Sequence, residues 1–265
     1  MKRLVKLGVV SLVVGLLLAG CNSGNSGKTG TSDTGKTAAE ETVLYFVRHG
    51  KTMFNTTGQV QGWSDTPLTD VGVEGAEKLG QGLKGTTFTK AYSSDLGRAV
   101  STVEHILKNS GNEKTELTTL SGIREWGYGG YEGRDNSEMW IPLFEEHGLT
   151  FDEDWTQYGE LTRKMSDEEI ANTIAENDET KTAETYDEIT KRTEEALDQI
   201  IAETSEKGGN VLIVSHGSEI PTILELIAPS SYQGEDISNC SVTKVIYKDG
   251  SYTAESIGDK SYLEK

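Results

Sequence analysis

The sequence predicts an α/β fold, and two strand-like segments of similar design are the main reason. One apolar segment, residues 43–47, runs into Arg48-His49-Gly50, and another, residues 211–214, runs into Ser215-His216-Gly217. Segments with apolar residues at helical spacing alternate with short strand-like segments, a pattern typical of a parallel sheet covered by helices. We therefore expect a three-layer α/β/α sandwich with a mostly parallel central sheet and a helical insertion that forms a cap.

The order of the elements follows from residue periodicity and from turn and capping residues. Strands are expected at residues 43–48, 91–93, 116–120 and 211–214, and in a closing hairpin formed by 242–248 and 251–257. Helices are expected from Thr69 or Asp70 to about Leu83, from about Asp95 to a stop at Gly111, from 185 to 206 and from 218 to 227.

Residues from about 135 to 182 differ in character from the rest of the domain. They are rich in acids and contain Trp140 and Trp155, with helical stretches but no strong strand. We interpret this segment as a helical insertion beside the site. Its tryptophans form a local core or, alternatively, stack on a substrate.

The N-terminus has the pattern of a secretory signal. Lys2, Arg3 and Lys6 precede an apolar run at residues 7–19, which is too short to span a bilayer comfortably. The segment that ends it, Leu18-Ala19-Gly20-Cys21, resembles the lipobox of bacterial lipoproteins. That resemblance implies a signal peptide at residues 1–20 and lipidation at Cys21. The alternative is an ordinary cleaved signal followed by a chance cysteine.

The rest of the chain divides into a tether and one domain. Residues 21–41 are mostly small and polar and predict a flexible linker, whereas residues 42–265 are long enough for a single domain with a substantial core. The formal net charge of −18 opposes binding to nucleic acid or anionic headgroups. We therefore expect no nucleic-acid partner, and membrane contact through the lipid at Cys21. The location implied is extracytoplasmic, attached to the bacterial cell membrane.

The cysteines and histidines limit the remaining chemistry. With Cys21 used for lipid, Cys240 is the second and last cysteine of the sequence, so a disulfide framework is excluded. No two of the four histidines stand at the spacing typical of metal ligands, which argues against a metal site.

Several motifs together resemble the histidine phosphatase superfamily, in its phosphoglycerate mutase-like branch. The first is Arg48-His49-Gly50-Lys51-Thr52 followed by Asn55. The pattern continues through Gln61-Gly62-Trp63, Asp65-Thr66-Pro67-Leu68, Ser93-Ser94-Asp95-Leu96-Gly97-Arg98, Ile123-Arg124-Glu125 and Val214-Ser215-His216-Gly217. The resemblance implies an α/β sandwich, a small phosphorylated substrate, no metal and no organic cofactor.

The same residues have a physical logic for phosphoryl transfer, in which catalysis depends on positioning and positive charge. A neutral His49 is expected to take the phosphoryl group and form a covalent intermediate. Arg48 and Arg98 are expected to hold its oxygens in bidentate fashion, and His216 to add a further donor. Asn55 and Gln61 complete the expected substrate-binding set, and the helix expected near Asp95 adds its positive end.

Glu125 is the expected proton donor for the leaving oxygen and the base for the attacking water. Asp95 and Glu132 are its rivals for this role, because one follows a strand and the other lies in the same glycine-rich loop. With these roles the chain is predicted to be a phosphatase that hydrolyses a small phosphomonoester.

Two other functions are kept as alternatives. A phosphoglycerate mutase would return the phosphoryl group to substrate, and mutases of this branch carry an arginine directly after the acid, where Trp126 stands here. Such mutases also carry an arginine pair in the insertion, of which Arg163-Lys164 is a faint echo. The second alternative is a non-catalytic module that uses the same fold to bind an anion.

Overall fold

The computed structural model describes residues 40–264. The predicted signal peptide, the lipidation residue Cys21 and most of the predicted linker lie outside the described residues. In the part of the chain that is described, no helix has the length and apolarity needed to cross a bilayer.

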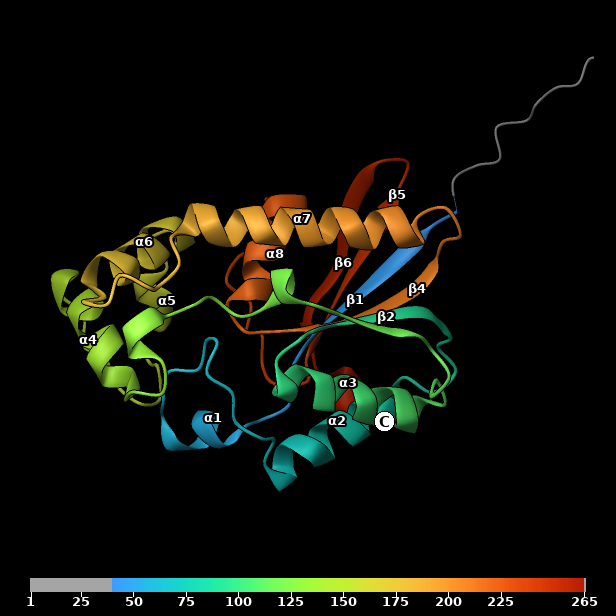
Figure 1. Ribbon diagram of the computed structural model, residues 1–265, viewed down its shortest axis with the longest axis horizontal. Coiled ribbons are helices and arrows are strands. Elements are labelled where there is room, and N and C mark those ends of the chain that lie inside the picture. Colours follow the sequence, from blue (N-terminus) through green and yellow to red (C-terminus); the bar gives the residue numbers. More distant parts are fainter. Residues whose placement is uncertain (1–39, 265) are drawn as a thin grey trace, which may run out of the picture. The chain divides into compact units, whose positions relative to one another are not determined.

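A six-stranded mixed sheet forms the centre of the domain, in the order β3-β2-β4-β1-β5-β6 (Figure 1). The four strands from β3 to β1 pair in parallel, whereas β5 pairs antiparallel with β1 and with β6. The strand bounds are β1 Thr42–Arg48, β2 Phe88–Ser94, β3 Leu117–Leu120, β4 Gly209–Ser215, β5 Val242–Lys248 and β6 Ser251–Asp259. The predicted mostly parallel sheet and its closing hairpin are thus confirmed.

Helices cover both faces of this sheet because successive strand residues point to opposite sides. In β1, Tyr45 and Val47 pack with α2 (Asp70–Gly82) and α3 (Gly97–Ser110). Leu44 and Phe46 pack on the other face with α7 (Tyr186–Thr204) and α8 (Glu219–Ile227). Figure 1 shows the strands between α7 above and the α2–α3 pair below, which confirms the three-layer sandwich.

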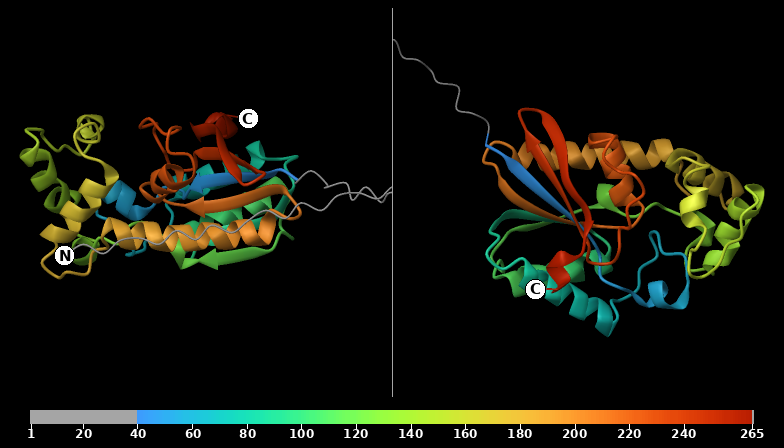
Figure 2. Two further views of the ribbon diagram at one scale, coloured as in Figure 1. Left: turned by 90° about the horizontal axis from the view of Figure 1, so that it is seen from above. Right: turned by 180° about the vertical axis from the view of Figure 1, so that it is seen from behind.

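A third cluster of buried side chains forms the cap. It contains α4 (Asn136–Glu146), α5 (Tyr158–Leu161) and α6 (Asp167–Asn177), and these helices gather at the N-terminal end of α7 in Figures 1 and 2. Trp140 and Trp155 pack edge to face within it, with ring centroids 5.2 Å apart. These two tryptophans therefore contribute to a local core. The remaining short helices are α1 Met53–Thr57, η1 Ser121–Ile123, η2 Gly129–Tyr131 and η3 Ser261–Glu264.

Two of the predicted helix boundaries are confirmed and one needs correction. Thr69 caps α2 by accepting a hydrogen bond from the Gly72 N–H, and Gly111 ends α3 at a φ of 81°. The helix expected to begin near Asp95 begins instead at Gly97. Asp95 makes a bidentate ion pair with Arg124 and takes no part in capping α3.

Candidate active site

The two histidines meet because their strands are parallel neighbours. In the β1–β4 ladder Arg48 lies opposite Ser215, so the residues that follow, His49 and His216, leave the sheet at the same edge. The His49 N–H donates to the Ser215 carbonyl over 3.0 Å, and the two imidazole centroids lie 5.2 Å apart. The structure therefore brings together the two residues that the sequence separates by most of the domain.

The backbone selects the tautomer of His49. Its Nδ1 lies 2.8 Å from the carbonyl oxygen of Gly50, which can only accept, so Nδ1 carries the proton of the neutral ring. Nε2 makes no hydrogen bond within residues 40–264 and keeps its lone pair. Burial, followed by the charges of Arg98 and Arg48, lowers the pKa of His49 well below its usual range. His49 is thus a buried, neutral imidazole with a free Nε2, as a nucleophile requires.

Arg48 and His216 flank this ring with donors that have no partner. Arg48 donates from Nη1 to the Ile237 carbonyl over 2.7 Å, whereas its buried Nε makes no hydrogen bond with any described residue. Its guanidinium lies close to Gly217, where a Cβ would approach Cζ to 3.1 Å. Both ring nitrogens of the fully buried His216 are also without partners in the described chain.

Arg98 lies near the histidines but is bound differently from what the sequence suggested. Its two Nη atoms donate to the backbone carbonyls of Gln61, Gly62 and Ser64 and to the carboxylate of Asp65, at 2.7–3.4 Å. In this structure the expected bidentate grip on phosphate by these two atoms is therefore replaced by contacts to loop 61–65. The physical reason is burial, since a guanidinium that is 1% exposed must find acceptors. Its Nε is the donor left without a partner among residues 40–264.

Asn55 and Gln61 each place a side-chain amide close to the histidines and arginines of the site. The Oδ1 of Asn55 accepts from the Thr52 N–H and from Asn239 Nδ2, which itself lies 2.9 Å from the His49 carbonyl. The Oε1 of Gln61 accepts from Thr52 and Thr66 hydroxyls. With both amide oxygens engaged, the Nε2 of Gln61 is left buried and without a partner in the described chain.

These unpaired donors form a pattern that points to a ligand. Of the nine buried side-chain atoms without a hydrogen-bond partner in residues 40–264, five belong to Arg48, Gln61, Arg98 and His216. Buried polar atoms are almost always satisfied, so such a concentration at one place marks a binding site. Because the arginine and amide nitrogens donate only, the site is suited to an anion.

The carboxylate of Glu125 lies at the start of α8. Its Oε1 accepts from the N–H groups of Trp126, Ser218 and Glu219 at 3.1–3.2 Å, and its Oε2 accepts from Ser218 alone. Burial lowers the pKa of Arg48 and of Arg98, and for both the charge of Glu125 is the largest opposing influence. Glu125 is thus close enough to both arginines for its charge to act on each of them.

The two rivals of Glu125 are engaged elsewhere. Asp95 pairs with Arg124, with two contacts of 2.6 Å. Glu132 accepts from the backbone N–H groups of Gly62, Trp63 and Ser64 and so shapes the loop that binds Arg98. Glu132 has a structural role in this loop, which leaves Glu125 as the better placed acid.

The positions at which a mutase is expected to carry cations lie in the cap and directly after Glu125. Arg163 and Lys164 are exposed on the cap, and Lys164 donates to the His147 carbonyl over 2.9 Å. Trp126, which follows the acid, is 4% exposed and donates through its indole N–H to Thr222. Trp126 therefore supplies no cation to the site, and Lys164 is engaged with a backbone carbonyl of the cap.

Sequence reasoning missed several residues that shape the site. Thr102 accepts from the Gly50 N–H, and Asn239 binds the His49 carbonyl. Arg192 binds the carbonyl of Glu125, and the Glu219 N–H donates to its carboxylate. Arg192 had one available signal: it lies three residues after the buried Ile189 and so falls on the inward face of an amphipathic helix.

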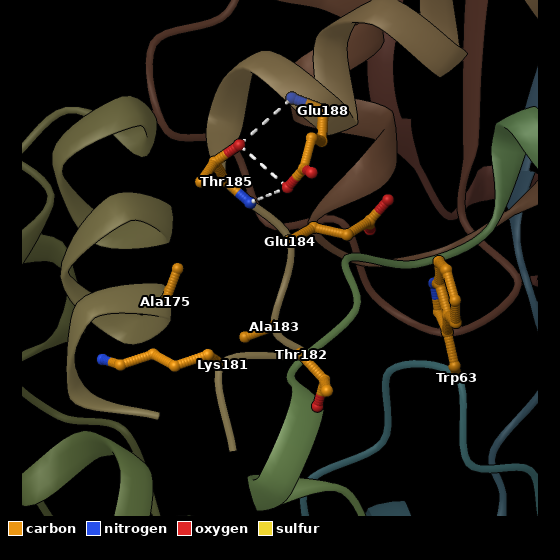
Figure 3. Close-up of a pocket in the computed structure, with 8 residues that line it drawn as sticks. All are labelled: Trp63, Ala175, Lys181, Thr182, Ala183, Glu184, Thr185 and Glu188. Atoms are coloured by element: carbon orange, nitrogen blue, oxygen red, sulfur yellow. Dashed lines mark hydrogen bonds between the residues drawn. The ribbon is translucent and has the colours of Figure 1, made fainter. Parts of the chain in front are cut away.

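A surface cavity of about 490 Å³ lies apart from the histidines (Figure 3). Its lining residues are Trp63, Ala175, Lys181, Thr182, Ala183, Glu184, Thr185 and Glu188, none of which belongs to the predicted site. Trp63 connects this cavity to the loop that carries Glu125, residues 122–127, which we call the acid loop. Its indole N–H donates to the Glu125 carbonyl over 3.1 Å.

Comparison with known proteins identifies the class of fold and site. The profile of the histidine phosphatase superfamily (branch 1) matches residues 44–156 and 142–260. Broad-specificity phosphatase YOR283W from Saccharomyces cerevisiae is 30% identical over 227 residues, covering 83% of this chain and 86% of that protein. The chain therefore belongs to the histidine phosphatase superfamily, branch 1.

Two further relatives carry mutase names. The probable phosphoglycerate mutase GpmB from Yersinia pestis is 28% identical over 229 residues, covering 83% of this chain and 94% of that protein. The crystal structure of a phosphoglycerate mutase from Bacillus anthracis is 39% identical, with a TM-score of 0.77, covering 86% of this chain and 97% of the other. The relatives are thus named for hydrolysis or for mutase activity, and both reactions are candidates for this site.

Proposed function

We propose that this protein is a phosphatase that hydrolyses a small phosphomonoester through a phosphohistidine on His49. The observation that carries the proposal is the set of unpaired donors on Arg48, Arg98, Gln61 and His216 around an imidazole whose Nε2 is free. Donors that lack partners among residues 40–264 can bind the phosphoryl oxygens of a substrate, which stabilises the charge that develops on those oxygens during transfer.

The first half-reaction loads the histidine. Nε2 of His49 forms a bond to phosphorus while the bond from phosphorus to the ester oxygen breaks, and that oxygen takes the bond's electron pair. Protonated Glu125 gives it a proton, so the alcohol leaves neutral. Oε2 is the oxygen suited to carry that proton, because it accepts one N–H whereas Oε1 accepts three.

The second half-reaction returns the protein to its starting state. A water oxygen bonds to phosphorus as the Nε2–phosphorus bond breaks, and the electron pair of that bond returns to the imidazole. Glu125, now a carboxylate, takes the proton of the water. The products are the alcohol and inorganic phosphate, and Glu125 is again protonated.

Hydrolysis is favoured over mutase activity by the positions at which a mutase is expected to carry cations. A phosphoglycerate carries a carboxylate besides its phosphate, and binding it calls for a further cation. Trp126 stands directly after Glu125, where an arginine is expected in a mutase, and Lys164 donates to the His147 carbonyl over 2.9 Å. The yeast relative is described as a broad-specificity phosphatase, which agrees with a site that reads the phosphoryl group more than the alcohol.

Mutase activity remains the second candidate because of the 39% identity to the Bacillus anthracis phosphoglycerate mutase. The products of the reaction distinguish phosphatase activity from mutase activity. With 3-phosphoglycerate and 4-nitrophenyl phosphate as parallel substrates, a phosphatase releases inorganic phosphate from the aryl ester and produces little 2-phosphoglycerate. Fast isomerisation with negligible phosphate release would overturn the proposal.

Trapping the covalent intermediate tests the mechanism directly. Rapid acid-free quenching with a ³²P-labelled aryl ester is expected to leave label on the wild-type protein that survives alkali and is lost in acid, as a phosphoramidate bond requires. H49A is expected to carry no label and to release no phosphate. H105A, which removes a histidine on α3 outside the site, is the control and is expected to label normally. Label retained by H49A would contradict the assignment.

For the N-terminal region, we propose that residues 1–20 are a signal peptide, that Cys21 is lipidated, and that residues 21–41 tether an extracytoplasmic domain. The support is the order of charge, apolar run, small residues and cysteine in the sequence. In a bacterial host, wild-type protein is expected in the membrane fraction with incorporated fatty-acid label. C21S is expected to lose the label. Label-free, secreted wild type would favour the ordinary signal peptide.

A further inference from the structure

Arg192 on α7 binds the backbone of the acid loop. Its guanidinium donates to the carbonyls of Gly122, Arg124 and Glu125 at 2.9–3.1 Å. It also contacts the carboxylates of Glu184 and Glu219 at 2.8–3.3 Å. All three nitrogens of the side chain are therefore used to join one loop to two helices.

Glu219 closes a ring of contacts between Arg192 and the proposed proton donor. Its backbone N–H donates to Oε1 of Glu125 over 3.1 Å, and its fully buried carboxylate accepts from Arg192 and, over 2.7 Å, from Thr193. Glu125 is thus fixed twice: its carbonyl by Arg192 and its side chain by the start of α8. A shift of either support moves the carboxyl group.

The other support of Arg192 is Glu184, which lies just before α7. Its carboxylate accepts from the Gly127 N–H over 2.8 Å, and its own N–H donates to the Gly127 carbonyl over 2.8 Å. Figure 3 shows Glu184 beside the Thr185–Glu188 capping box that starts the helix. A Cβ at Gly127 would lie 3.2 Å from both Glu184 and Trp63, so these two side chains pack closely against this glycine.

We propose that Arg192 is the positioning residue for the proton donor: through the carbonyls of the acid loop and the carboxylate of Glu219, it sets where Glu125 delivers its proton. This inference rests on the proposed phosphatase function. It assigns Arg192 no contact with substrate, and its effect is expected to appear only where the leaving oxygen needs a proton.

The test uses the dependence of rate on the leaving group. Phenolate is a poor leaving group and needs the proton of Glu125, whereas 4-nitrophenolate leaves readily without it. The parameter to compare is kcat/KM, because it covers the steps up to formation of the phosphoenzyme and excludes its hydrolysis. Phenyl and 4-nitrophenyl phosphate also have similar size, so differences in binding largely cancel.

R192K, measured in the full chain, is expected to lower kcat/KM for phenyl phosphate by about tenfold or more, and for 4-nitrophenyl phosphate by less than about threefold. Lysine keeps the charge but cannot bridge several acceptors in a fixed plane. In an E125Q background, R192K is expected to leave the ratio of the two substrates unchanged, because the proton it positions is gone. K191Q, on the exposed face of the same helix, is the control and is expected to match wild type.

Each outcome has a distinct meaning. If R192K lowers both substrates equally, or changes the ratio further in the E125Q background, the positioning role is overturned even though the phosphatase stands. If wild type hydrolyses neither ester, the proposed function itself fails. Should R192K be unstable in thermal unfolding, R192Q, a second variant that is used only if it has a wild-type Tm, gives the decisive ratio instead.

Discussion

His49 shows how a single side chain is prepared for chemistry by its neighbours. The Gly50 carbonyl accepts a hydrogen bond from the Nδ1–H of His49. The Thr102 hydroxyl accepts from the Gly50 N–H over 2.9 Å, which fixes the turn after β1. Burial and two guanidinium groups keep the ring neutral by lowering its pKa. A neutral ring with a fixed tautomer is the form that can attack phosphorus, so the local structure and the proposed role agree.

Arg48 offers a prediction at this scale. R48A is expected to lower kcat/KM for 4-nitrophenyl phosphate by about 100- to 1000-fold, because it removes a preorganised donor from developing phosphoryl charge. Phosphate release under steady-state conditions is the measurement. R163A, which removes an exposed arginine from the cap, is the matched control and is expected to act like wild type. An R48A variant within tenfold of wild type would show that this guanidinium does not bind the phosphoryl group.

Residue types at the site could be predicted from the sequence, whereas their hydrogen bonds could not. His49, His216 and Arg48 follow strands directly, so their positions at one sheet edge depend only on strand order. Arg98 shows the limit. Its guanidinium binds carbonyls of a loop more than thirty residues earlier, and loop conformation has no periodicity from which it could be inferred.

At the scale of elements, the start of α3 is capped from a distance. Leu96 occupies the N-cap position without a side-chain bond, and Asp65 accepts instead from the Gly97 and Arg98 N–H groups at 2.6 and 3.4 Å. The positive end of α3, expected to face phosphate, therefore binds this carboxylate. The sequence predicted only that this helix begins near Asp95, and the carboxylate that caps it lies 32 residues from Gly97.

Replacing this cap tests its contribution. D65A is expected to lower the free energy of unfolding by about 1 kcal/mol or more, because the first N–H groups of α3 and the buried guanidinium of Arg98 lose an acceptor. D65N, which keeps one acceptor oxygen for the Gly97 or the Arg98 N–H, is expected to lose less. Urea denaturation monitored by circular dichroism measures both, with an unchanged m-value showing that the folded state stays compact. Equal stability of D65A and wild type would mean that the cap contributes nothing.

For the whole molecule, the layers of the sandwich could be predicted from the sequence, whereas the side-chain contacts between the layers could not. Alternating strands and helices, together with the apolar run of each strand, suffice to define a sandwich. The contacts that join the layers at the site depend on single side chains, such as Arg192 of α7 reaching the acid loop and Asn239 reaching His49. Such contacts link residues far apart in sequence, and no local pattern encodes them.

Stability of the whole domain should depend on pH through its buried titratable groups. Lowered pKa values of His49 and His216 mean that below pH 6.5 the unfolded chain binds more protons, so stability falls as the pH falls. Burial raises the pKa of Asp167 to about 6 and that of Glu219 to about 8. In the pH range between the usual pKa of each group and its raised pKa, the folded state therefore binds more protons than the unfolded state. Their contributions fall as the pH rises, opposite to those of the histidines.

The range from pH 7 to pH 8 isolates Glu219. The histidines are almost neutral there in both states and Asp167 is ionised, whereas Glu219 is protonated when folded and ionised when unfolded. The free energy of unfolding is therefore expected to fall by about 1 kcal/mol from pH 7 to pH 8. E219Q, which cannot titrate and keeps one acceptor oxygen for either Arg192 or Thr193, is expected to lose this dependence in urea denaturation at the two pH values. An equal fall in E219Q would place the titrating group elsewhere, and no fall in wild type would mean that Arg192 keeps Glu219 ionised in the folded protein.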